Sequence, residues 1–302
     1  MHNPRFDPAS PNVFFVDHTD TASLRTKYAE NADLKDQLDR LVNVDYVWGA
    51  DGRSLLEVVK DQAPLDFVFA SHVFEHLANP VAWLDELYEV LDTDGVVSLV
   101  IPDKRFCFDV NRRETDIADV VDGYLNGATR PSYRSIYDFF SKMVAVDTAA
   151  LWAGTVDYST VVRDDIEPDL YSMELCRRSA EGEYVDSHCG VYTPASFLTI
   201  LEKLAKLGLL RFRVKAFQPT QVNSLEFRVV LEKSSETDPE RLRKTIHESV
   251  EAARSTLGGE PSTPAVAQPV LGPRELALIT AKRRAVDRMH RARAKVRSLR
   301  HR

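Results

Sequence analysis

The sequence predicts an α/β fold, a Rossmann-like, doubly wound and mostly parallel sheet. Short apolar runs alternate with helix-compatible segments over residues 12–101, and this alternation is typical of a parallel sheet wound with helices. Residues 96–101 form a nearly continuous apolar run that ends at Pro102, as expected for a strand buried on both faces. With 302 residues, of which 44% are hydrophobic, the chain can bury a large core.

The individual elements are expected in strand and helix pairs. Four strands and the three helices between them are predicted over residues 12–17, 21–28, 42–48, 53–61, 65–70, 79–91 and 96–101. A regular spacing of apolar residues resumes after the insert and predicts a helix that starts at Thr193 and Pro194 and ends near Gly208. Alternating runs over residues 211–217 and 225–231 predict a closing antiparallel pair at the sheet edge.

Changes in composition along the chain predict its domain organisation. Residues 1–234 form the main domain, in which 110–185 is an inserted cap or substrate region with helical stretches at 116–125 and 135–145. A helical extension, a Pro- and Gly-rich linker and a basic amphipathic helix are expected to follow, over 235–257, 258–273 and 274–302.

Charge is distributed unevenly between the body and the tail. The net charge is −7, yet residues 274–302 carry eleven Lys or Arg against Glu275 and Asp287, which leaves the rest strongly acidic. The acidic body argues against nucleic-acid binding by the main domain. The basic tail is interpreted as a solvated or self-associating helix, or as a contact for an anionic membrane, a nucleic acid or a partner protein.

Cysteine usage and hydropathy predict a cytoplasmic protein. Cys107, Cys176 and Cys189 stand far apart without a CxxC pair, which favours neither a disulfide framework nor a zinc site. No apolar run approaches the roughly 18 residues that cross a bilayer, and the first dozen residues hold three prolines where a signal peptide has an apolar core. Peripheral attachment to a membrane through the tail is the alternative.

Two stretches resemble the fourth and fifth strand motifs of class I S-adenosylmethionine-dependent methyltransferases. Ser71, Glu75 and His76 match an S-x-x-x-E-H turn after the fourth strand, and residues 90–95 resemble the turn into the fifth, with Val96 where the family has a second glycine. The strings over 101–109 and 186–194 are similar to a bacterial subgroup found near sugar and polysaccharide biosynthesis genes. The resemblance spans about residues 2–233.

The resemblance also implies a strand and a glycine-rich loop ahead of Met1. In the subgroup these elements precede a sequence like the His-Asn-Pro at residues 2–4, so the natural start is expected upstream. The family topology places that first strand between the strands expected at 12–17 and 65–70. Without it, both neighbours have an open edge, and residues 1–11, with three prolines, do not replace it.

The resemblance implies S-adenosyl-L-methionine as the cofactor. Asp17 ends its strand where nucleotide-binding folds place a carboxylate that accepts the ribose hydroxyls, and His18 either flanks the ribose or is a loop residue. Asp51 and Gly52 are expected at the adenine, or else form an ordinary Asp-Gly turn. Ser71 and His72 are expected beside the cofactor at the end of the next strand.

If the methyl acceptor is a hydroxyl, a general base would assist the reaction, and His76 and His188 are the candidates. The resemblance implies that Glu75 caps the turn that follows it. Asp103, Lys104 and Arg105 hold an anionic or sugar substrate, or simply form a charged loop. The two histidines of His72-Val-Phe-Glu-His76 lack the HExxH order, so no metal is expected.

Together these features predict a methyltransferase that acts on a small polar or sugar-type acceptor. The alternative is a non-catalytic, methyltransferase-like protein that serves as partner or scaffold in polysaccharide biosynthesis. A nucleotide-sugar or dinucleotide enzyme fits the acid at position 17 but not the turn after residue 70. The acceptor itself is not predicted, because residues 110–185 carry no interpretable pattern.

Overall fold

The structure is a computed structural model that describes residues 6–7, 10, 12–29, 38, 41–49, 52–161 and 167–258. The chain divides into two units, Met1–Pro261 and Ser262–Arg302. The predicted basic helix at 274–302 and nearly all of the predicted linker lie outside the described residues. None of the described helices is both long and apolar enough to cross a membrane.

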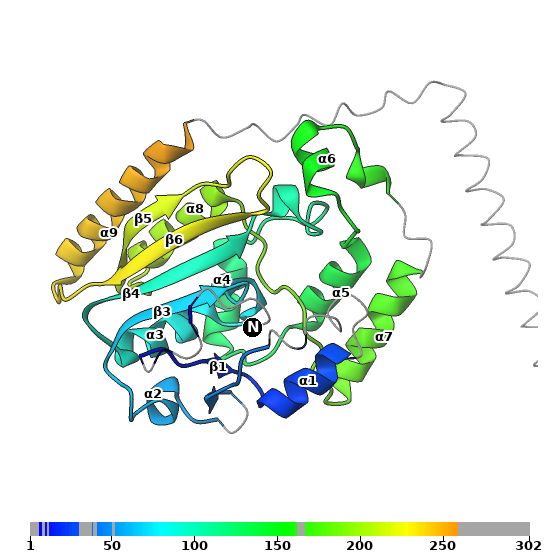
Figure 1. Ribbon diagram of the computed structural model, residues 1–302. Helices are drawn as coiled ribbons and strands as arrows, with labels where there is room; N and C mark the ends of the chain where they lie inside the picture. The colour runs from blue at the N-terminus through cyan, green and yellow to red at the C-terminus, as the bar shows by residue number, and fades with distance from the viewer. Residues whose placement is uncertain are drawn as a thin grey trace, which may run out of the picture. The chain divides into compact units, whose positions relative to one another are not determined.

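The α/β class is confirmed, and its main sheet has four strands in the order β3-β4-β6-β5 (Figure 1). These strands are β3 (Leu65–Ser71), β4 (Leu91–Pro102), β6 (Glu226–Lys233) and β5 (Phe212–Gln218). Only β3 and β4 are parallel, whereas β6 runs antiparallel to both β4 and β5.

The prediction of a mostly parallel sheet is therefore wrong, because the described sheet is mixed. The antiparallel closing pair itself is confirmed. Its seven-residue connection, from 219 to 225, is shorter than the crossover that a parallel pair requires. The expected strands at 12–17 and 42–48 contribute nothing to this sheet, so parallel pairing is limited to β3 and β4.

Those two expected strands form a small sheet of their own. β1 (Val16–Asp17) and β2 (Tyr46–Val47) pair in parallel, and α1 (Thr21–Ala29) connects them along the chain. The edge of β3 that faces away from β4 has no strand partner among the described residues. The open edges expected at these two positions are thus present in the described part of the chain.

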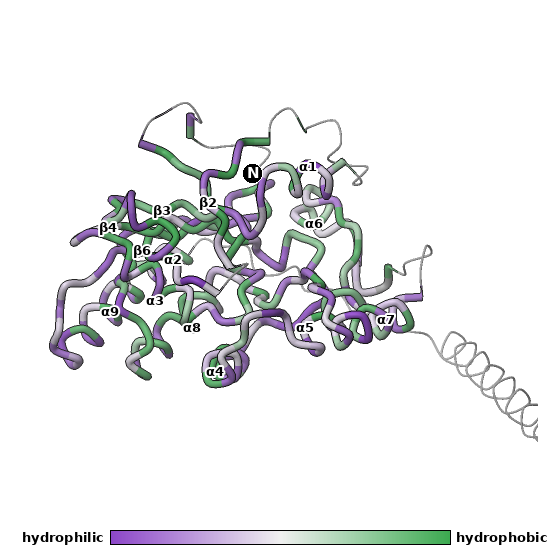
Figure 2. Tube along the Cα trace, turned by 90° about the horizontal axis from the view of Figure 1, so that it is seen from below, coloured by the Kyte–Doolittle hydropathy of each residue, from purple (hydrophilic) through white to green (hydrophobic). Residues whose placement is uncertain are grey.

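Helices cover one face of the main sheet (Figure 2). They are α3 (Pro80–Val90), α8 (Pro194–Lys206) and α9 (Pro239–Arg254). Val97, Leu99 and Ile101 of β4 are fully buried in the core shared with these helices. The short α2 (Leu55–Val58) packs into the same core next to α3. The helices predicted at 79–91, 193–208 and 235–257 are confirmed by α3, α8 and α9.

The insert between residues 110 and 185 is helical and has small cores of its own. It contains α4 (Ile117–Leu125), α5 (Tyr133–Lys142), α6 (Thr148–Ala153) and α7 (Pro168–Ala180), which confirms the helical stretches predicted at 116–125 and 135–145. Buried Ile136 of α5 packs with Leu175 and Cys176 of α7. Short 3₁₀ turns complete the fold, namely η2 (Phe74–His76), η3 (Lys104–Phe106), η4 (Tyr158–Thr160) and η5 (Ser255–Leu257).

After the insert the chain returns to the carboxyl ends of β3 and β4. Tyr192 forms a β-bridge with Asp103 just beyond β4, and the Tyr192 carbonyl accepts a hydrogen bond from the backbone N–H of Lys104 (2.8 Å). The segment before it, residues 186–190, is thereby held beside the turn that follows β3. This return places residues from both sides of the insert in one location.

Candidate functional site

The site begins at the sharp turn that follows β3. The backbone N–H of His72 still donates to the carbonyl of Val100 (3.0 Å), which extends the β3–β4 ladder by one residue. His72 then adopts a positive φ of 53°, a conformation that costs energy for a residue other than glycine and persists where the surroundings impose it. The turn directs η2, with Glu75 and His76, toward the segment that returns from the insert.

His72 lies between two carboxylates. Its Nε2 is 3.0 Å from Glu226 Oε2 on β6, and its Nδ1 is 3.3 Å from Glu75 Oε1. The carboxylates of Glu226 and Glu75 outweigh burial and raise the pKa of His72 to about 9. The imidazole of His72 is therefore cationic at neutral pH. Ser71, the residue before it, is half-buried and is the last residue of β3.

Glu75 is fully buried, yet neither of its carboxylate oxygens accepts a hydrogen bond among the described residues. The expectation that Glu75 caps the turn that follows it is wrong, because its carboxylate accepts no hydrogen bond from a described residue there and Asn79 caps the next helix instead. The residue acts through its backbone instead. Its carbonyl accepts hydrogen bonds from the N–H groups of Cys189 (2.7 Å) and Gly190 (2.8 Å), which tie the turn to the returning segment.

This backbone link brings the two predicted bases, His76 and His188, into direct contact. Their rings meet edge to face, with centroids 4.7 Å apart and an interplanar angle of 82°. Each ring is held through Nδ1 by a carboxylate, with 2.9 Å from His76 to Asp186 and 2.6 Å from His188 to Asp109. Both imidazoles are therefore fixed in orientation, and Nε2 is the nitrogen left for other chemistry.

The paired charges shift the pKa values of these groups. Burial lowers the pKa of His76, but the Asp186 carboxylate outweighs burial and the net pKa is raised. Burial raises the pKa of Asp186, yet the hydrogen bond with His76 brings the net pKa below its ordinary value. For Asp109 the partners His188 and Arg112 likewise outweigh burial and lower the pKa. Both carboxylates are thus ionised at neutral pH.

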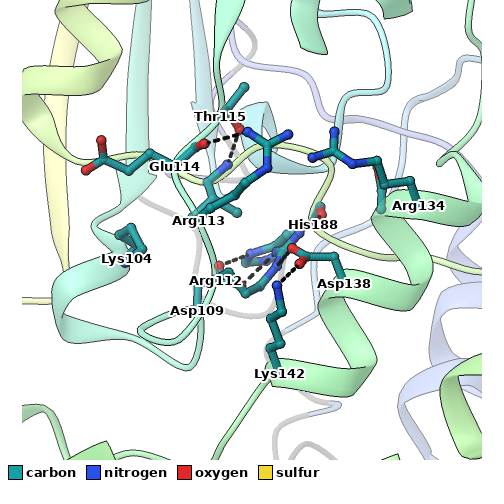
Figure 3. A network of polar contacts seen from close by, with 12 residues as sticks. Lys104, Asp109, Arg112, Arg113, Glu114, Thr115, Arg134, Asp138, Lys142 and His188 are labelled. Carbon is teal, nitrogen blue, oxygen red and sulfur yellow. Dashed lines mark hydrogen bonds and ion pairs between the residues drawn. The ribbon is translucent and has the colours of Figure 1, made fainter. Parts of the chain in front are cut away.

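Arg112 supports this pair from the insert (Figure 3). Its buried guanidinium donates to Asp109 Oδ1 (2.8 Å), to Asp138 Oδ2 (2.9 Å) and to the His188 carbonyl (2.9 Å). Lys142 adds a second cation on Asp138, at 2.5 Å. The network joins α5 to the segment that carries His188.

A cavity of about 310 Å³ opens beside this network. It is lined by α4, α5 and the segments around residues 112–115 and 189–192. Several charged side chains face it, among them Arg112, Arg113, Arg130, Arg134, Asp119 and Asp138. Arg113 and Arg134 both pair with Asp119 (Figure 3 shows the two arginines), so the charges that line the cavity are largely matched.

Asp17 and His18 lie at the carboxyl end of β1, as expected. His18 Nδ1 is 2.6 Å from Asp17 Oδ1, and the backbone N–H of His18 donates to the same oxygen (2.7 Å). Burial raises the pKa of Asp17, but its contacts with His18 outweigh burial and lower the net pKa. The Asp17 carboxylate is therefore ionised at neutral pH, as a ribose-binding acid must be.

Tyr28 of α1 relates this corner to the histidine pair. Burial, and next the charges of Asp17 and Asp186, raise the pKa of Tyr28. Both carboxylates thus lie near one tyrosine, and Asp186 is the partner of His76. A charge at the carboxyl end of β1 and a charge bound to His76 therefore act on the same tyrosine.

Of the two residues expected at the adenine, the structure describes only Gly52. Asp51 lies outside the described residues. Gly52 has a φ of 77° and Gly49 a φ of 95°, values that glycine adopts readily and other residues rarely. These angles fit the glycine turn that was the alternative interpretation of this segment.

Asp103 and Arg105 bind each other, and Lys104 binds nearby backbone. Fully buried Asp103 accepts from Thr220 Oγ1 (2.6 Å) and from Arg105 Nη2 (2.6 Å). Lys104 Nζ donates to the Val110 carbonyl (3.0 Å), and burial lowers the pKa of Lys104. These contacts fasten the end of β4 to the β5–β6 connection, which favours the charged-loop interpretation over a substrate subsite.

Asp109, Arg112, Asp138 and Asp186 were not predicted as site residues. Asp109 and Asp186 belong to the two strings that suggested the bacterial subgroup, so the sequence did mark their neighbourhoods. No model of a known protein family matches the chain, and no curated protein matches it. Membership in the class I methyltransferases stays a prediction that rests on the motifs.

Proposed function

We propose that the chain is an S-adenosylmethionine-dependent methyltransferase with a Rossmann-like, class I core, acting on a small polar or sugar-type acceptor. The observation that carries this proposal is that the charges of Asp17 and of Asp186, the partner of His76, both raise the pKa of one residue, Tyr28. In open α/β sheets, ligands bind at the carboxyl ends of the strands. Both corners lie at such ends.

The described residues fit the ribose end and the methyl end of the cofactor. An ionised carboxylate at Asp17 accepts hydrogen bonds from a ribose diol. When bound, S-adenosylmethionine supplies an electrophilic methyl group, so an oriented nucleophile is the main further requirement. The turn after β3 offers side chains that orient and deprotonate such a nucleophile.

The histidine pair supports proton transfer from an acceptor hydroxyl. Asp186 holds Nδ1 of His76 and Asp109 holds Nδ1 of His188, so the Nε2 of either ring is the atom that takes the proton. The cavity beside Arg112, which neither histidine lines, has room for a small acceptor. Its mixed charges suit a hydroxyl-rich molecule better than a strongly charged one.

Calorimetric titration with S-adenosylmethionine tests the proposal. We expect Asp17→Asn to weaken binding by roughly 10-fold to 100-fold, about the 1.5–3 kcal/mol of a hydrogen bond to a charged group. Asp20→Asn is the matched control, because Asp20 is an exposed acid in the same loop that only caps α1 through Ser23. Equal affinity in the two variants would contradict the proposed ribose contact.

Absence of heat with the unmodified chain would overturn the proposal as a whole. The alternative function, a non-catalytic partner or scaffold in polysaccharide biosynthesis, would then be the better explanation of the fold. Circular dichroism of each variant establishes that loss of binding does not reflect loss of folding.

A further inference from the structure

Glu75, His76 and His188 form a cluster whose potential metal-ligand atoms converge. One such atom from each residue lies within 4.8 Å of the other two. Glu75 and His76 come from η2, and His188 comes from the segment that returns from the insert. The hydrogen bonds from Cys189 and Gly190 to the Glu75 carbonyl hold these two segments together.

The two imidazoles are oriented as metal-bound histidines are. In metal centres the ring nitrogen that does not touch the metal usually donates to a carboxylate, which fixes the ring and its tautomer. Here Asp186 lies 2.9 Å from Nδ1 of His76, and Asp109 lies 2.6 Å from Nδ1 of His188. Both Nε2 atoms are left as ligands, and Arg112 anchors Asp109 in turn.

The Glu75 carboxylate is an independent sign of a cation. Its side chain is fully buried and neither oxygen accepts a hydrogen bond among the described residues, although buried polar groups nearly always do. Its ion partner His72 lies on one side only, 3.3 Å from Oε1. The hydroxyl of Ser187, next to His188 in the chain, is likewise buried without a hydrogen-bond partner among those residues.

We propose that Glu75, His76 and His188 bind a divalent first-row transition metal such as Zn²⁺, with at least one coordination position open. Two histidines and one carboxylate are a frequent ligand set for catalytic zinc and for non-haem iron. Metal-to-ligand distances of about 2.0–2.2 Å place tetrahedral ligand atoms roughly 3.4 Å apart. The present atoms lie within 4.8 Å of one another, so metal binding draws them closer together.

This proposal differs from the sequence expectation of no metal. That expectation rests on His72 and His76, which lack the HExxH order, and in the structure His72 is an ion partner of Glu75. The third ligand is distant in sequence, so no local spacing could reveal it. The metal also changes the role of the two histidines, because an Nε2 that coordinates a cation does not act as a base.

The open position has a chemical use that rests on the proposed function. A divalent cation lowers the pKa of a bound hydroxyl or water and holds it in place. A bound acceptor oxygen would thereby become a nucleophile without a histidine base. The metal site itself requires no such acceptor and is tested separately from cofactor binding.

Direct metal binding to the full chain is the test. The protein is stripped with a chelator and titrated with ZnCl₂ by calorimetry, and the bound metal is counted by mass spectrometry after gel filtration. We expect one equivalent of Zn²⁺, an absorption band in the visible range when Co²⁺ replaces it, and no competition from Mg²⁺, which prefers oxygen ligands.

Variants locate the site. We expect His76→Gln and Glu75→Gln to weaken Zn²⁺ binding by more than about 100-fold, and Asp186→Asn, which removes an orienting carboxylate, by about 10-fold to 100-fold. His247→Gln is the matched control, because His247 is an exposed histidine on α9. His76 and Asp186 are both partly exposed, so these two variants test the site even if Glu75→Gln unfolds.

Two results would overturn the proposal. One is the absence of stoichiometric Zn²⁺ in the unmodified protein, and the other is equal Zn²⁺ affinity of the His76→Gln and His247→Gln variants. Binding of S-adenosylmethionine is measured in a separate titration in the presence of chelator. Cofactor binding without metal binding, or the reverse, therefore distinguishes failure of this inference from failure of the proposed function.

Discussion

Asp138 illustrates how single residues stabilise the site from a distance. It touches neither histidine, yet it accepts from Arg112, whose other contacts are Asp109 and the His188 carbonyl. Burial raises the pKa of Asp138, but hydrogen bonds from Lys142 and Arg112 outweigh burial and lower the net pKa below 3.8. A carboxylate of this kind stabilises the folded chain only while it is ionised.

We therefore expect Asp138→Asn to lower the free energy of unfolding by about 1–2 kcal/mol at neutral pH. Since the folded pKa lies below the unfolded value, the difference from wild type is fully present above about pH 4 and disappears as pH falls through the folded pKa. Urea unfolding at a series of pH values measures it. Asp85→Asn, in a more exposed pair with Arg211, should cost less than about 1 kcal/mol. A difference at Asp138 that does not change with pH would contradict the electrostatic explanation.

Sequence reasoning identified the titratable residues at strand ends but not their partners. Asp17, His72, His76 and His188 were singled out by position and resemblance, and the structure brings the last two into contact. Asp109 and Asp186 were missed because a hydrogen bond between residues far apart in sequence depends on the path of the insert. That path leaves no periodic signal in residues 110–185.

At the scale of elements, the most accurate predictions were the starts of helices that have a capping residue followed by proline in the first turn. α3 begins after Asn79, which caps Ala82 N (3.0 Å), with Pro80 in the first turn. α8 begins in the same way at Thr193 and Pro194. The strands near residues 12–17 and 42–48 were predicted too long, because an apolar run forms a ladder only where a partner strand is available, and in the described structure each pairs over two residues.

The Thr193 cap of α8 is expected to matter for stability beyond the helix itself. Thr193 Oγ1 accepts from Ser196 N (3.2 Å) and donates to Glu114 Oε1 (2.9 Å), so it links α8 to the start of the insert. We expect Thr193→Ala to cost about 1–2 kcal/mol and Thr193→Ser to cost much less, because serine keeps the hydroxyl. Thr199→Ala, at a half-buried site on the same helix whose hydroxyl donates to the Ala195 carbonyl, is the control for thermal and urea unfolding. Equal losses for Ala and Ser at position 193 would argue against the cap.

For the whole molecule, the sheet could be predicted in part only. Alternating strands and helices fixed the α/β class, and the last two strands were correctly expected to be antiparallel. The separate pairing of the two strands near the amino terminus could not be derived, because a strand's neighbours depend on which edges are occupied. The predicted roles of the tail at 274–302, whether self-association or contact with a membrane, nucleic acid or protein, lie outside the described residues.

Within the described part of the chain one edge of β3 has no strand partner, which bears on the state of the chain in solution. Phe67 on this strand is 41% exposed, and its described aromatic neighbour is Phe6, whose ring centroid lies 5.3 Å away. An apolar strand edge without a partner promotes pairing between copies. We expect the chain to self-associate as its concentration rises, and Phe67→Lys to reduce that association, because a lysine on an edge strand opposes such pairing.

Light scattering coupled to size-exclusion chromatography over a concentration series measures this association. Leu125→Lys is the matched control, since Leu125 is an apolar residue with 75% exposure at the end of α4 and far from any strand in sequence. If the two variants reduced association equally, general surface hydrophobicity and not the β3 edge would be responsible. A chain that stays monomeric at every concentration would indicate that the edge is already covered within one molecule, and the segment before β1 that carries Phe6 would be the first candidate for that cover.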